Sequence, residues 1–112
     1  PCGKAINSKL QKGGVYMRAI TLKSNSPETV VSLLKNAMDR EKKILIDTIR
    51  VTKEKIDSLT KDLGVDIDNL MKGEVEHTES NDMQLIELEG EIETLKHLET
   101  ELKTLESVEI CT

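Results

Sequence analysis

The longest regular pattern of the chain begins at Pro27 and contains no glycine and no further proline before Gly64. Apolar or small residues recur in it at alternating steps of four and three: Leu45, Ile49, Thr52, Ile56, Leu59 and Leu63. Such steps place the residues on one face of an α-helix, as in a seam that packs against another helix. The pattern predicts a helix about 55 Å long at the usual 1.5 Å per residue.

The start of this helix carries favourable boundary residues. Ser26 is a good N-cap and Pro27 suits the first helical position. Glu28 places negative charge beside the unpaired N–H groups of the first turn. The sequence therefore predicts that the helix begins at residue 27.

Two glycines compete for the other end of the helix. Gly64 can adopt the left-handed conformation that ends a helix, after which Asp66 caps a further short turn. Alternatively the helix continues and stops at Gly73. The sequence leaves both alternatives open, a helix over 27–63 or over 27–72.

A second long helix is predicted after a polar loop over about 73–81. It spans about 82–109, and its apolar side consists of Leu85, Leu88, Ile92, Leu95, Leu98, Leu102, Leu105 and Val108. The step from Leu95 to Leu98 is three residues where a strict heptad gives four, which broadens the apolar face and favours a short bundle.

Two long helices joined by a short loop favour antiparallel packing, so we expect a mainly α, coiled-coil-like helical hairpin. Ile44, Ile46 and Val51 add apolar surface outside the first row. One partner helix does not cover both faces, which predicts a dimer packed as a four-helix bundle. The residues expected to hold the assembly together are Ile44, Leu45, Ile49, Val51, Ile56, Leu59, Leu95 and Leu102.

The chain before this domain, residues 1–25, reads as a basic N-terminal arm ahead of the hairpin domain at 26–112. Residues 15–23 alternate well enough for a short strand, with an extended arm as the alternative. No function is assigned to residues 1–16, which are polar and contain three glycines.

A strand, a capped turn and a long helix over about Arg18 to Met38 resemble the beginning of ribbon–helix–helix regulators and antitoxins. In those proteins paired strands from two subunits enter the DNA major groove. Here the chain departs from the pattern, because the first helix continues for several more turns. Arg18 and Lys23 of this stretch, together with Lys9 and Lys12 of the basic arm before it, are the candidate nucleic-acid or partner contacts.

Charge is strongly segregated along the chain. The net charge is −5, but residues 1–25 carry five basic side chains and no acid, while residues 73–112 carry two lysines and twelve acids. Glu87, Glu89, Glu91 and Glu93 place like charges four residues apart on the second long helix, which is unfavourable unless a cation covers them. We expect either the basic arm or a basic partner protein there, with nucleic acid the less favoured partner of the arm.

Catalytic and cofactor chemistry has little support in the sequence. The chain has no Phe, no Trp and one tyrosine, and it lacks phosphate-binding glycine motifs and a nucleophile elbow. Glu74 and His77 form one E-x-x-H where di-iron bundles use two, and His97 stands apart. We therefore expect no enzyme activity, no metal and no cofactor.

Cys2 and Cys111 lie near opposite ends of the chain. An end-to-end disulfide is one alternative, but a reduced pair is favoured, and the chain has no apolar run long enough to span a bilayer. These features favour a cytoplasmic protein.

The preferred function is a non-catalytic interaction or scaffold subunit that self-associates through the hairpin, and the alternative is a small DNA-binding regulator or antitoxin that uses the ribbon and basic arm.

Overall fold

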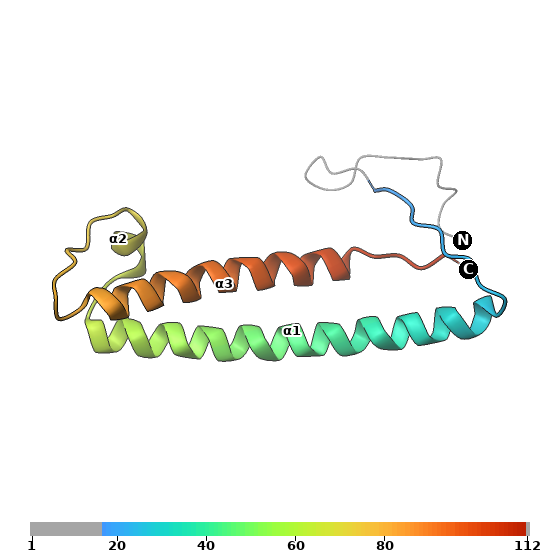
Figure 1. Ribbon diagram of the computed structural model, residues 1–112, viewed down its shortest axis with the longest axis horizontal. Helices are drawn as coiled ribbons and strands as arrows, with labels where there is room; N and C mark the ends of the chain where they lie inside the picture. The colour runs from blue at the N-terminus through green and yellow to red at the C-terminus, as the bar shows by residue number, and fades with distance from the viewer. Residues whose placement is uncertain (1–16, 112) are drawn as a thin grey trace.

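The computed structural model describes residues 17–111, which contain three helices. They are α1 (Pro27–Leu63), α2 (Ile67–Met71) and α3 (Asp82–Glu106). Figure 1 shows α1 and α3 side by side in opposite directions, with α2 in the connection at one end. The helical hairpin that the sequence predicts is confirmed.

Helix α1 contains good helix formers and ion pairs between successive turns. The Arg50 guanidinium lies 2.6 Å from a carboxylate oxygen of Glu54 and 3.4 Å from one of Asp47. Ser26 occupies the N-cap position, but its side chain makes no capping hydrogen bond; its N–H donates to Oγ of Ser24 at 3.0 Å. The boundary therefore agrees with the sequence, whereas the expected side-chain cap is absent.

Gly64 ends α1, which resolves the choice between the two glycines. Its φ of +64° is left-handed, and the N–H groups of Gly64 and Val65 both donate to the Thr60 carbonyl, at 2.8 and 3.2 Å. This is the glycine-terminated helix end in which the next apolar residue folds back on the helix. Asp66 then caps α2 by accepting a hydrogen bond from the Asp68 N–H at 2.8 Å.

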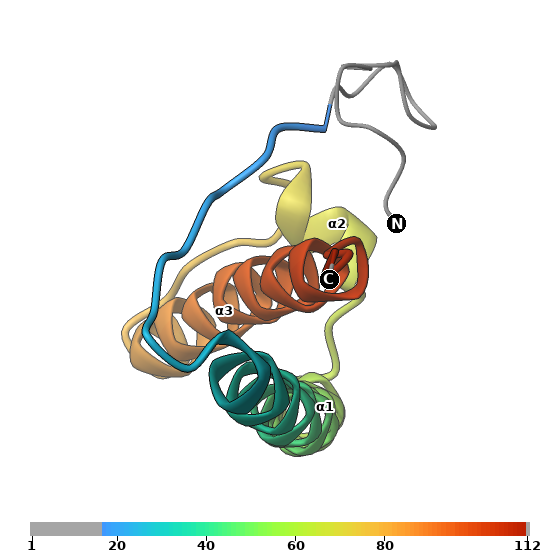
Figure 2. The ribbon, with the colours of Figure 1, turned by 90° about the vertical axis from the view of Figure 1, so that its right-hand side faces the viewer.

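The core lies at the closed end of the hairpin. Leu85 and Leu88 of α3 are fully buried. They belong to a hydrophobic cluster whose buried members come from all three helices: Ile56, Leu70, Leu85, Leu88 and Ile92. Figures 1 and 2 both place α2 beside α3, where the short helix brings Leu70 into the cluster. The core is wholly aliphatic.

The two long helices differ in length, so part of α1 has no helical neighbour among residues 17–111. Helix α3 has 25 residues and α1 has 37. Lys55 of α1 pairs with Glu91 of α3, and Glu41 lines a groove together with Leu105. This register leaves residues 27–40 of α1 extending beyond the end of α3, as Figure 1 shows.

The two ends of the described chain narrow the predictions made for them. Of the two alternatives at the start, a short strand or an extended arm, the strand is not seen over residues 17–24, and residues 15 and 16 lie outside the described part. A strand needs a neighbour to accept its hydrogen bonds, and residues 17–111 contain no strand that could pair with this segment. Helix α3 ends at Glu106 rather than near residue 109.

Cys111 is disulfide-bonded, whereas the sequence favoured a reduced thiol. The only other cysteine of the sequence, Cys2, lies outside the described residues. Structural disulfides are commoner in oxidising compartments, so this residue gives no support to a cytoplasmic location.

Candidate interaction surface

The apolar row that the sequence assigned to self-association serves mainly to close the hairpin within one chain. Leu45, Ile49 and Ile56 are buried on the side of α1 that faces α3. The other three, Leu59, Leu95 and Leu102, are half-buried. The burial of these six residues needs no second copy of the chain, and the four on α1, Leu45, Ile49, Ile56 and Leu59, form the inner row that packs on α3.

Ile44 and Val51 lie on a different face and remain exposed. Their side chains are 57% and 42% accessible, and Leu33, a residue that the sequence analysis missed, is 61% accessible. We call the set to which they belong the outer row: Leu33, Ala37, Arg40, Ile44, Asp47 and Val51, all exposed. The steps along it are four, three, four, three and four, the spacing of a second helix-packing seam.

The outer row lies about 100° around the helix from the inner row, at 100° per residue. Helix α3 packs on the inner row and therefore does not cover the outer row. The signal that would have found Leu33 and Ala37 in the sequence is the same alternation of four and three, shifted by one residue from the inner row. Ile46, also 54% exposed, points to the opposite side and does not belong to either row.

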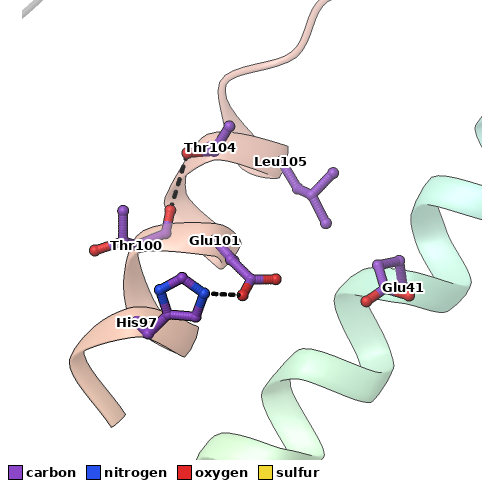
Figure 3. A pocket seen from close by; sticks show the side chains of 6 residues that line it. All are labelled: Glu41, His97, Thr100, Glu101, Thr104 and Leu105. Carbon is purple, nitrogen blue, oxygen red and sulfur yellow. Dashed lines mark hydrogen bonds and ion pairs between the residues drawn. The ribbon is translucent and has the colours of Figure 1, made fainter. Parts of the chain in front are cut away.

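A shallow groove runs between the two long helices near the end of α3. It has a volume of about 320 Å³ and is lined by Glu41, His97, Thr100, Glu101, Thr104 and Leu105. Figure 3 shows Glu41 across from the α3 residues. Nε2 of His97 lies 2.9 Å from Oε1 of Glu101. The groove is open to solvent, and its polar side chains are the five named among its lining residues.

The acidic residues of α3 do not form one cluster. The Glu91 carboxylate lies 3.8 Å from Nζ of Lys55, and the Glu93 carboxylate lies 3.7 Å from Nζ of Lys96. Glu87 and Glu89 are exposed. Lys55 of α1 thus offsets part of the negative charge of α3, and the sequence of α3 alone does not reveal this contact.

The predicted basic contacts are described only in part. Arg18 and Lys23 are exposed, and neither forms an ion pair with an acidic residue of the described chain. Lys9 and Lys12 lie outside the described residues. The expected contact between the basic arm and the acidic helix stays a prediction.

Within residues 17–111, His, Cys, Asp and Glu side chains nowhere gather in a group of three suited to a metal ion. His77 of the E-x-x-H instead places Nδ1 at 2.8 Å from Oδ1 of Asp82, at the start of α3. Over the same residues, no helix combines the length and apolar character needed to cross a bilayer.

Comparisons of the chain with protein families, with curated protein sequences and with solved structures found no match.

Proposed function

We propose that this chain is a non-catalytic interaction or scaffold subunit that self-associates through the outer row of α1. The observation that supports the proposal is the exposure of Leu33, Ile44 and Val51 at helix-packing spacing on a face that α2 and α3 leave open. In this arrangement two hairpins bring four long helices together.

The physical argument rests on apolar area. Three large aliphatic side chains of one helix face, Leu33, Ile44 and Val51, are each more than two-fifths exposed, and exposed apolar surface gathered on one face is typical of association sites. A second helix packed on this face removes their apolar area from water, which is worth roughly 25 cal/mol per Å². The inner row is already satisfied within the chain, so the outer row carries the contact.

The experiment compares two lysine substitutions on the same helix. Ile44→Lys places a charge in the outer row, whereas Ile46→Lys removes a similarly exposed isoleucine from the opposite side. We expect light scattering to show a dimer for the wild type and for Ile46→Lys, and a monomer for Ile44→Lys at the same concentration. A wild-type monomer, or equal effects of the two substitutions, would refute the proposal.

The DNA-binding alternative rests on charge alone. The described part of the arm has no strand to enter a groove, and only Arg18 and Lys23 of the four basic contacts lie within the described residues. A basic arm binds phosphates without sequence preference, and such binding weakens steeply with salt. We therefore keep the interaction subunit as the proposed function.

A further inference from the structure

The outer row contains two charged residues among its apolar ones. Arg40 and Asp47 occupy the two positions between Ala37, Ile44 and Val51, and all five side chains are exposed. Charged residues within a helix-packing seam lower its affinity but select the orientation and register of the partner. Their signs therefore carry information about the helix that packs there.

Resting on the proposed self-association, we infer that two copies of α1 pair antiparallel through the outer row, with Arg40 of each copy beside Asp47 of the other. The row is nearly symmetric about its middle. Placing Leu33 opposite Val51 of the second copy also places Ala37 opposite Asp47 and Arg40 opposite Ile44. Leu33 and Val51 then meet at both ends of the seam, which spans about 27 Å.

In this register the two opposite charges come together. Arg40 and Asp47 of the second copy lie three positions apart along the shared axis, about 4.5 Å at the helical rise. The two-fold symmetry produces this pair twice. Opposite charges at such separations attract, and both pairs lie beside apolar residues that exclude water.

A parallel pair in register has the opposite electrostatics. It places Arg40 against Arg40 and Asp47 against Asp47, and like charges facing each other across a seam disfavour that arrangement. The antiparallel arrangement is therefore favoured twice: it brings Arg40 and Asp47 together, and it avoids the like-charge contacts of the parallel pair.

Both side chains are available for the contact. Arg40 forms no ion pair with any residue of the described chain. Asp47 shares only the longer contact of Arg50, at 3.4 Å, while the guanidinium lies closer to Glu54, at 2.6 Å. A carboxylate accepts several hydrogen bonds, so Asp47 retains room for a second guanidinium.

A charge-swap experiment on the full chain tests the inference. Arg40→Glu and Asp47→Arg, each alone, replace both attractive pairs by repulsive ones, and we expect each to raise the dimer dissociation constant about tenfold or more. The double variant reverses both signs and restores the attraction, so its dissociation constant should return to within about threefold of the wild type. Sedimentation equilibrium provides the constants, and circular dichroism verifies that each variant stays helical.

Matched controls lie on the other sides of α1. Lys53→Glu and Asp57→Arg make the same charge changes at exposed positions outside the outer row and should leave the dissociation constant within about twofold. A wild-type dimer that single reversals do not weaken beyond these controls, or that the double variant does not restore, overturns the antiparallel pairing while leaving self-association intact. A wild type that is monomeric at every concentration refutes the proposed function itself.

Discussion

Nζ of Lys55 on α1 lies 3.8 Å from Oε1 of Glu91 on α3. The other ion pairs among the described residues join neighbours three to five positions apart in the sequence. The Lys55–Glu91 pair therefore links the two long helices and marks the register at which they pack. It also places one of the α3 glutamates beside a cation from the other helix.

This link predicts unequal effects of charge reversal on α3. Glu91→Lys sets two cations against each other between the helices, so we expect the free energy of unfolding to fall by about 1 kcal/mol at low salt. Glu93→Lys affects only an exposed contact within α3 and should cost less than half as much. Urea titrations provide both values, and the difference should shrink in about 0.5 M NaCl. Equal costs would mean that Lys55 does not reach Glu91 in solution.

The buried cluster predicts a strong effect of truncating Leu88. This side chain is 0% exposed, so Leu88→Ala leaves a cavity and should lower the free energy of unfolding by about 2–5 kcal/mol. Ile86, two residues away on the same helix, is 54% exposed, and Ile86→Ala should cost less than about 1 kcal/mol. Denaturant unfolding of the two variants under identical conditions measures the contrast. A similar cost for both would mean that α3 is rotated about its own axis, so that Leu88 is not the more buried of the two residues.

Two glycines of the hairpin predict opposite responses to alanine. Gly90 lies within α3, and an added Cβ meets nothing within 4 Å, so Gly90→Ala should raise the free energy of unfolding by about 0.5–1 kcal/mol. Gly64 has a φ of +64°, a conformation that alanine disfavours. Gly64→Ala should therefore lower the free energy of unfolding by about 1 kcal/mol or more. Thermal melts followed by circular dichroism distinguish the two signs. A destabilising Gly90→Ala would reveal a close neighbour at Gly90 in the assembled protein.

Nucleic-acid binding is expected to be weak and governed by salt. Fluorescence anisotropy with a labelled duplex at low salt should show at most weak association through the basic arm, and this should vanish by about 0.15 M salt. Tight binding that persists at physiological salt, and that a change of duplex sequence abolishes, would instead establish the regulator alternative.

Much of the hairpin follows from local sequence. The steps of four and three that include Leu45, Ile49 and Ile56 predicted one face of α1, and all three residues are buried. Gly64 was one of two predicted helix ends and is the one observed. Such features depend on helix periodicity and on a single backbone conformation, both of which are encoded within a few residues.

The remaining features depend on which helix lies opposite which. The contact between Lys55 and Glu91 requires the register of α1 against α3, and the sequence of either helix alone does not contain it. For the same reason, the residues expected for self-association included members of both the inner row and the outer row. The sequence does not show whether an apolar side chain packs within its own chain or against another. The choice between a strand and an extended arm over 15–23 depends in the same way on a neighbour, and no strand forms over its described residues.

Sedimentation equilibrium of the full chain over about 1–100 μM, a range that brackets micromolar dissociation constants, directly measures self-association. One chain has a mass of 12.5 kDa. Self-association through the outer row predicts a reversible rise of the average mass with concentration, toward twice the mass of one chain. A mass that stays at that of one chain over the whole range would contradict the account, because the outer row would then be free surface.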